Sequence, residues 1–121
     1  MPKNDMAGQK TNTNESGSLT VDTACSSSLY ALHLACQSLL AGDCTAAVVG
    51  GSNLVTSVEK QLGSESLGVL SPSSTCHTFD ESADGFGRGD GIAALYIKRL
   101  SDAISDGDPI RAVIRATAVN S

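Results

Sequence analysis

The segment SSSLYALHLACQSLLAG, residues 26–42, constrains the fold more than any other part of the sequence. Its apolar side chains recur three and four positions apart, which is the spacing of one face of an α-helix; they are Leu29, Leu32, Cys36, Leu39 and Leu40. Gly42 is a natural stop for this helix, because glycine readily adopts the left-handed conformation found at helix C-termini. The pattern predicts an amphipathic helix that must bury one face against another element.

Short apolar runs before and after this helix predict strands. Residues 45–51 (TAAVVGG) are typical of a strand covered on both faces. Further strands are predicted at residues 19–23, 92–99 and 110–119. A short helix is predicted at residues 100–105, closed by Asp106-Gly107, and a helical turn is predicted near residues 58–63. Strands alternating with helices indicate an α/β fold with at least some parallel strand pairing.

Residues 1–18 (MPKNDMAGQKTNTNESGS) are almost wholly polar and show no periodicity. Such a stretch buries too little apolar surface to offset the entropy lost on ordering. We therefore expect a disordered polar leader, residues 1–18, followed by a partial domain, residues 19–121. The total of 121 residues suits a single domain.

Charge and hydropathy narrow the class of protein. Eight basic against thirteen acidic side chains give a net charge of -5, with no basic cluster of the kind that binds nucleic acid. The longest apolar runs are far shorter than the roughly 20 residues needed to span a bilayer. The first thirty residues show no secretory signal. These features predict a soluble, cytoplasmic chain without nucleic-acid or membrane partners.

The sequence has four cysteines, which are Cys25, Cys36, Cys44 and Cys76. No two of them have C-x2-C spacing, and the two histidines, His33 and His77, complete no metal-ligand pattern. Disulfides are not expected either, since there is no export signal and the cysteine density is low. We predict reduced thiols and no metal, with Cys36 and Cys44 as small core residues.

Cys25 lies among small residues where a predicted strand meets the first turn of the predicted helix, in VDTACSSSL. Unpaired backbone N–H groups and the positive end of the helix dipole favour a thiolate there, the form that acts as a nucleophile. The same N–H groups could bind the oxyanion formed when a thioester is attacked. Asp22 and Thr23 are expected to fix this turn by local hydrogen bonds. A buried cysteine followed by an N-cap serine fits the same pattern.

Four stretches of the chain resemble β-ketoacyl synthase (ketosynthase) domains of the type I polyketide synthase and animal fatty acid synthase kind. VDTACSSSL resembles their active-site segment; the resemblance continues in CTAAVVGGSNL (44–54), LGVLSPSSTCHTFDESADGFGRGDG (67–91) and YIKRLSDAISDGDPIRAVIRATAVNS (96–121). It covers residues 18–121 and is strongest toward the iterative polyketide synthases of fungi. The chain is thus similar to part of a ketosynthase domain.

The resemblance implies a thiolase-like, layered α/β/α/β/α fold, only part of it present here, and a homodimer of the full domain. It implies that Cys25 takes an acyl group from an acyl carrier protein as a thioester. A malonyl-type extender on the carrier then loses CO2 and attacks that thioester in a decarboxylative Claisen condensation, with the Cys25 N–H as part of the oxyanion hole. No metal or cofactor is bound directly, because phosphopantetheine arrives on the carrier protein.

The sequence also departs from the family pattern. Ketosynthases pair the cysteine with two histidines, in segments resembling EAHGTGT and KSNIGH, and neither segment is present. His33 and His77 match neither position, so we expect a helix histidine and a loop histidine without catalytic roles. Because decarboxylation needs such groups to stabilise developing enolate charge, we predict that the chain alone does not condense substrates.

The block GFGRGDG suggests a phosphate cradle, but its spacing is not that of a P-loop. We interpret its glycines as turn residues beside the strand at residues 92–99; they are Gly85, Gly87, Gly89 and Gly91. An ion pair between Arg88 and Asp90 is expected to hold this loop. The neighbouring acidic side chains are expected to form a solvated face; they are Asp80, Glu81 and Asp84.

Two other functions remain open. The chain could be a non-catalytic remnant with a structural or interaction role, although retention of Cys25 argues against that. It could also be a ketosynthase of fatty acid synthesis, although the triple serine after Cys25 and the FGRGDG block favour the type I synthases.

Overall fold

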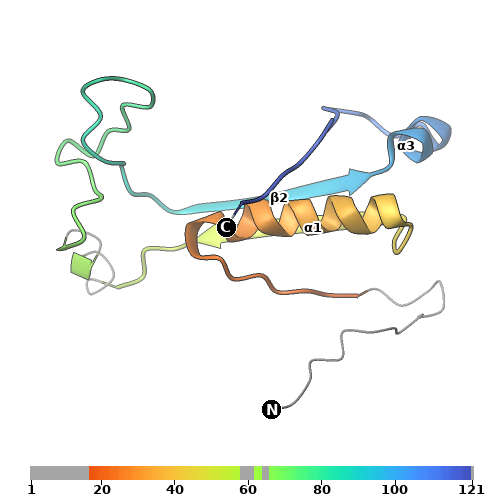
Figure 1. The fold of residues 1–121 in the computed structure, drawn as a ribbon, viewed down its shortest axis with the longest axis horizontal. Helices are drawn as coiled ribbons and strands as arrows, with labels where there is room; N and C mark the ends of the chain where they lie inside the picture. The colour runs from red at the N-terminus through yellow and green to blue at the C-terminus, as the bar shows by residue number, and fades with distance from the viewer. Residues whose placement is uncertain (1–16, 58–61, 64–65, 121) are drawn as a thin grey trace, which may run out of the picture.

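The computed structural model describes residues 17–57, 62–63 and 66–120. Its elements in chain order are η1 (Ala24–Ser26), α1 (Ser27–Ala41), β1 (Ala46–Asn53), β2 (Gly91–Lys98) and α3 (Leu100–Asp106). α1 lies along the sheet of β1 and β2; the described parts of the connection between the two strands extend from one end of that sheet, and α3 lies at the other (Figure 1). Residues 1–16 of the predicted leader, and most of the predicted turn near residues 58–63, lie outside the described residues.

The periodicity of residues 26–42 correctly predicted α1. Gly42 ends the helix in the left-handed conformation, with φ +80°. Its N–H donates to the Leu39 carbonyl at 3.3 Å, and the N–H of Asp43 donates to the Ser38 carbonyl at 2.9 Å. These two bonds satisfy carbonyls that the end of a helix would otherwise leave without partners.

β1 and β2 pair antiparallel over eight residues, from Ala46 opposite Lys98 to Asn53 opposite Gly91. Both strands were predicted, but they pair antiparallel with each other, whereas at least some parallel pairing was expected in the fold. The connection over residues 54–90 brings the chain back to the end of the sheet where β1 finishes, so β2 runs in the opposite direction beside it. In the described part of the chain, parallel pairing is confined to the single bridge between Leu70 and Phe86.

One face of the sheet packs against α1. Val49 of β1 is buried, and so is Leu39 of α1. On the other face lie Val48 and its cross-strand partner Tyr96, which are 74% and 65% exposed. β1 was predicted to be covered on both faces. Among the described residues, only the face that packs against α1 is covered.

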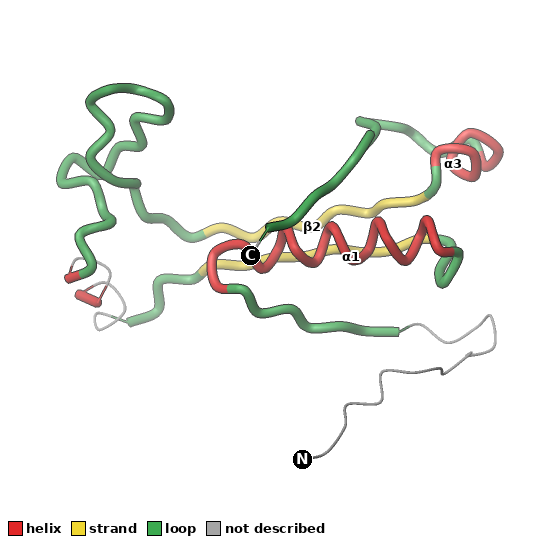
Figure 2. Tube along the Cα trace, in the orientation of Figure 1, coloured by secondary structure: helices red, strands yellow, loops and turns green. Residues whose placement is uncertain are grey.

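Two predicted strands are not strands in the structure: residues 19–23 and 110–119 form no strand ladder, and Figure 2 shows both as loop. A strand needs a neighbour for its backbone hydrogen bonds, and β-branched sequence alone does not provide one. Residues 110–120 instead run back toward α1. There Tyr30 donates its O–H to the Asn120 carbonyl, and His33 Nδ1 hydrogen-bonds Thr117 Oγ1 at 2.8 Å.

α3 follows β2 directly and confirms the predicted short helix, with Gly107 in the left-handed conformation at its end. Lys98, the last residue of β2, forms ion pairs with Asp106 and with Asp108, the latter at 2.8 Å. Both carboxylates raise the pKa of Lys98, Asp106 most strongly. These contacts fasten the C-terminal end of α3 to the end of the sheet. No helix of the described residues is long and apolar enough to cross a membrane.

Candidate active site

Cys25 is the middle residue of η1, the single 3-10 turn that leads directly into α1. Its side chain is exposed. Ala24, immediately before it, has φ +57°, in the left-handed region that residues with a Cβ rarely adopt. Such a conformation costs about 1–2 kcal/mol and persists only where surrounding contacts hold it. The chain therefore makes a sharp, strained turn just before the candidate nucleophile.

Hydrogen bonds on both sides of Cys25 hold this turn. Asp22 Oδ1 accepts the N–H of Ala24 at 3.1 Å, and the N–H of Thr23 donates to Ser27 Oγ at 2.9 Å. Ser27 Oγ donates in turn to the Ala24 carbonyl at 2.6 Å. These bonds confirm that Asp22 and Thr23 fix the turn locally. We call residues 22–27 the elbow.

Ser26 closes the elbow further. Its hydroxyl donates to the Thr23 carbonyl and lies 2.8 Å from Thr23 Oγ1. Each hydroxyl of the elbow thus bonds within the elbow itself, while the thiol of Cys25 stays exposed beside them. A thiol exposed at the start of a helix, on a turn held by its neighbours, can meet an incoming electrophile without rearrangement of the backbone.

Neither histidine of the sequence is brought to Cys25. His33 is half-buried on α1 and bonds to Thr117, while His77 lies in the connection between β1 and β2, where its carbonyl accepts the N–H of Asp80 at 3.1 Å. Over the described residues the structure shows no hydrogen bond from Cys25 to either ring. This agrees with the expectation that His33 is a helix histidine and His77 a loop histidine. All four cysteines are free thiols, and the described residues contain no cluster of potential metal ligands.

The GFGRGDG block packs against the loop that contains residues 69–76. Ser71 donates its N–H to the Phe86 carbonyl at 3.0 Å, and Phe86 donates its N–H to the Val69 carbonyl at 3.1 Å. Gly85 has φ +139°, and a Cβ there would lie 2.5 Å from the Leu70 carbonyl carbon and from the Ser71 nitrogen. Gly85 therefore permits a close approach of two chain segments, and not simply the tight turn that was predicted.

Gly87 has the same role. A Cβ on this residue would lie 2.3 Å from the Ser74 carbonyl oxygen, whereas one on Gly89 or Gly91 would meet nothing within 4 Å. The N–H of Gly87 donates to Cys76 Sγ at 3.1 Å. Two of the four glycines, Gly85 and Gly87, are thus required by close packing.

The predicted ion pair between Arg88 and Asp90 is not among the ion pairs that the described residues form. Asp90 Oδ1 instead accepts the N–H of Val55 at 2.5 Å, just beyond β1. Two residues before Val55, at the end of β1, Asn53 donates its side-chain N–H to the Gly89 carbonyl at 2.7 Å. The loop is therefore held by the exit of β1, because a carboxylate beside an unpaired backbone N–H gains a charge-assisted hydrogen bond.

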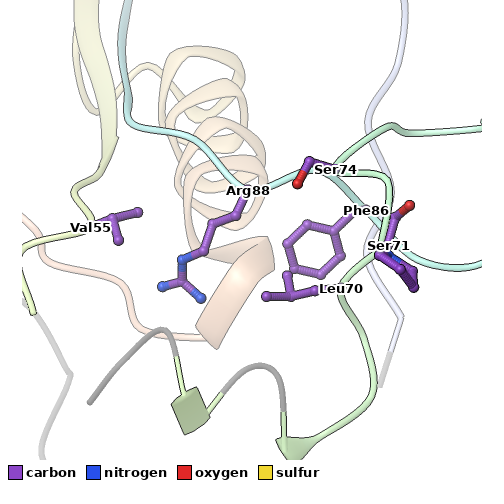
Figure 3. A pocket seen from close by; sticks show the side chains of 7 residues that line it. Val55, Leu70, Ser71, Ser74, Phe86 and Arg88 are labelled. Carbon is purple, nitrogen blue, oxygen red and sulfur yellow. The ribbon is translucent and has the colours of Figure 1, made fainter. Parts of the chain in front are cut away.

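A cavity of about 410 Å³ lies where the GFGRGDG block meets the loop before it (Figure 3). Its lining residues are Val55, Leu70, Ser71, Pro72, Ser74, Phe86 and Arg88. The side chain of Arg88 extends beside Phe86 and Leu70, with its guanidinium toward the side of Val55. The sequence does not predict the contacts of Asn53 with Gly89 and of Asp90 with Val55, because a polar residue near a strand end does not show which distant backbone group it will bond.

The acidic loop is solvated, as predicted: Asp80, Glu81 and Asp84 are all exposed. Asp80 Oδ1 accepts the hydroxyl of Ser82 at 2.7 Å and its N–H at 2.8 Å. Both bonds lower the pKa of Asp80, the side-chain bond more strongly. The carboxylate caps its own turn and is not paired with another acid.

Comparison with known proteins assigns the family. The sequence profile described as "Beta-ketoacyl synthase, N-terminal domain" matches residues 13–103, and the chain belongs to this family. Among its relatives are the highly reducing polyketide synthase rstn3 of Aspergillus nomiae, 67% identical, and resH of Aspergillus sclerotiorum, 64% identical, each over 104 residues. Those residues are 86% of this chain and 4% of each relative's length.

Comparison with solved structures gives the same family. A ketosynthase from module 6 of the bacillaene synthase of Bacillus subtilis 168 matches with a TM-score of 0.71 and 46% identity. The OzmH KS7 oxazolomycin ketosynthase domain of Streptomyces albus matches with a TM-score of 0.68 and 45% identity. Each alignment covers 74% of this chain and 16% of the solved chain. The chain is therefore part of a polyketide synthase ketosynthase domain, with part of its thiolase-like fold, and it resembles those of fungal highly reducing synthases.

Proposed function

We propose that Cys25 is the acyl-accepting nucleophile of a polyketide synthase ketosynthase. The observation that carries this proposal is the elbow: an exposed thiol on the turn before α1, held on both sides by hydrogen bonds of Asp22, Thr23 and Ser27. The family assignment supports it, because the elbow lies within the matched residues.

The proposed chemistry has two steps. The Cys25 thiolate attacks the carbonyl carbon of an acyl thioester carried on the phosphopantetheine of an acyl carrier protein. The carbonyl reforms, the phosphopantetheine thiolate leaves and takes up a proton, and the acyl group stays on Cys25. In the second step a malonyl-type thioester loses CO2, its α-carbon bonds to the acyl carbon, and the Cys25 thiolate is released with a β-ketoacyl product on the carrier.

The elbow supplies the first step from this chain's own residues. Cys25 lies in η1, directly before α1, and its N–H is the proposed donor to the oxyanion that forms in this step. The hydroxyls of Ser26 and Ser27 are occupied by Thr23 and Ala24, so they serve to shape the turn. Nothing in this step calls for a metal or a cofactor held by this chain.

The second step needs groups that this sequence lacks, namely histidines in EAHGTGT-like and KSNIGH-like segments. We therefore propose that the 121-residue chain, used alone, accepts an acyl group at most and does not condense. In the complete ketosynthase the partners are an acyl carrier protein, acyl and malonyl thioesters, and a second copy of the domain.

Acyl loading tests the proposal. The purified chain is incubated with hexanoyl-phosphopantetheine and analysed by intact and peptide mass spectrometry, alongside Cys25→Ala and the matched control Cys76→Ala. We expect one hexanoyl group on Cys25, none on Cys25→Ala, and unchanged loading of Cys76→Ala. Loading distributed over several cysteines, or none on Cys25, contradicts the proposal. A β-keto product formed by this chain alone, with malonyl carrier protein, contradicts the expected lack of condensation.

A further inference from the structure

The two glycines near the end of β1 have different surroundings. Gly51 shares the α1-facing side of the strand with Ala47 and Val49, since side chains alternate along a strand. A Cβ on Gly51 would lie 2.8 Å from Ser28 Cβ and 3.5 Å from Ser28 Oγ. Two carbon atoms in contact are normally about 3.5–4.0 Å apart. The first turn of α1 therefore occupies the space that a side chain on Gly51 would need.

Ser28 cannot yield this space by rotating. The atom in the way is its Cβ, which is fixed to the helix backbone, so relief requires movement of the first turn of α1. Ser27, the neighbour of Ser28, accepts the N–H of Thr23 and donates to the Ala24 carbonyl. A shift of Ser28 would pull on both bonds, and these are the bonds that hold the backbone on each side of Cys25.

We propose that Gly51 is a positioning residue for Cys25: its lack of a side chain lets the first turn of α1 rest on β1 and so sets where the thiol lies. The inference rests on the proposed role of Cys25 for its functional meaning. A glycine inside a strand often marks the close approach of another chain segment. The contact between Gly51 and Ser28 can therefore be tested by itself, without acyl transfer.

Gly50 provides a matched control in the neighbouring position. It faces the other side of β1, and a Cβ there would lie 3.6 Å from the Ala93 carbonyl oxygen, an ordinary contact. Glycine-to-alanine substitution at residues 50 and 51 makes the same chemical change one residue apart in the same strand. A difference between the two variants therefore reports the contact with Ser28 and not the general effect of losing a glycine.

The experiment compares the 121-residue chain with Gly51→Ala, Gly50→Ala, Ser28→Gly and the double variant Gly51→Ala/Ser28→Gly. Two rates are measured for each: iodoacetamide modification of every cysteine, by peptide mass spectrometry, and hexanoyl loading of Cys25. We expect Gly51→Ala to slow hexanoyl loading of Cys25 by about tenfold or more, since small displacements of a reacting group in a complex have large effects on rate. The alkylation rate of Cys25 should also fall, because the backbone donors around the thiolate move with the turn. Reaction of Cys44, at the far end of α1, should change less than twofold, and Gly50→Ala should behave like the parent chain.

The double variant separates positioning from misfolding. Removing Ser28 Cβ removes the clashing atom, so Gly51→Ala/Ser28→Gly should recover most of the Cys25 rate relative to Ser28→Gly alone, even if Gly51→Ala itself does not fold. The inference is overturned if Gly51→Ala leaves both rates unchanged, if Gly50→Ala is equally impaired, or if the double variant shows no recovery. Failure of the parent chain to load a hexanoyl group overturns the proposed function, while the alkylation rates still decide the role of Gly51.

Discussion

The N–H of Thr23 donates to Ser27 Oγ at 2.9 Å, across the turn that carries Cys25. The bond joins the last residue before η1 to the first residue of α1, so it spans the elbow from one side to the other. Because Ser27 Oγ also donates to the Ala24 carbonyl, a single hydroxyl fixes both the entry to the turn and the start of the helix. The position of the nucleophile thus depends on a side chain that does not touch the reacting atoms.

Replacing Ser27 with alanine should therefore slow acyl loading of Cys25. The change removes two hydrogen bonds, each worth about 1 kcal/mol net, and we expect loading to fall by about fivefold or more. Ser38→Ala is the matched control, since it makes the same substitution near the other end of α1. Equal loading rates for Ser27→Ala and Ser38→Ala would show that the hydroxyl of Ser27 does not hold the elbow.

Gly85→Ala should open the contact between Leu70 and Phe86. The positive φ alone costs about 1–3 kcal/mol for a residue with a Cβ, and the new atom would also collide with the backbone of Leu70 and Ser71. We expect amide hydrogen exchange of Ser71 and Phe86, whose N–H groups bond across this contact, to accelerate by about tenfold or more. Gly89→Ala, where a Cβ meets nothing within 4 Å, should leave both amides as slow as in the parent chain. Unchanged exchange in Gly85→Ala would contradict the close approach.

Local features of the sequence predicted the elements that depend on local rules. Residues 26–42 carry both the period of a helix and its glycine stop, and α1 begins and ends within one residue of that segment. The hydrogen bonds of Asp22 and Thr23 were also predictable, because they reach no farther than four residues along the chain. The same holds for α3, whose end is set by Gly107.

Features that depend on distant partners could not be predicted in this way. Residues 110–119 have the composition of a strand, yet the described chain offers them α1 as a neighbour and no strand to pair with. Asp90 lies two residues from Arg88 in sequence, but its partner in the structure is the backbone N–H of Val55, 35 residues away. The role of Gly51 likewise depends on Ser28, and a sequence pattern does not show which face of β1 a helix will cover.

The pKa of Asp102 should depend on Arg99. Arg99 Nε donates to Asp102 Oδ2 at 2.8 Å, and this bond is the main cause that lowers the pKa of Asp102 below its ordinary value of 3.8. A carboxyl whose pKa is lowered by folding stabilises the folded state above its unfolded pKa and loses that contribution as the pH falls through the folded pKa. Arg99→Gln should therefore raise the Asp102 pKa, as followed by carboxyl-carbon NMR, and reduce the dependence of stability on pH below the ordinary carboxyl pKa of about 4.

Asp80 is the internal control for this titration. Its pKa is lowered by Ser82 and not by Arg99, so it should titrate at the same pH in the parent chain and in Arg99→Gln. If both carboxyls moved together, the substitution would be acting through the overall charge of the chain. If neither moved, the contact between Arg99 and Asp102 would not persist in solution.

Thr117→Val should loosen residues 110–120 from α1. Valine has nearly the shape of threonine but cannot hydrogen-bond His33 Nδ1, so the change removes a contact of about 0.5–1.5 kcal/mol. Arg111 and Arg115 lie in this segment, and trypsin cleaves after both; we expect cleavage there to accelerate by about two- to tenfold, because proteolysis follows the population of the detached segment. Thr56→Val, in the exposed loop after β1, is the control that makes the same change elsewhere.

A double-mutant cycle identifies the partner in this contact. If His33 and Thr117 act through one hydrogen bond, His33→Leu and Thr117→Val should each speed cleavage at Arg111 and Arg115, and the double variant should be cleaved hardly faster than either single variant. The bond between Tyr30 and Asn120 remains in all three variants, so the segment should stay attached in part and cleavage should not reach the rate of an unfolded peptide. Additive effects of the two substitutions would mean that His33 and Thr117 stabilise the segment through separate contacts.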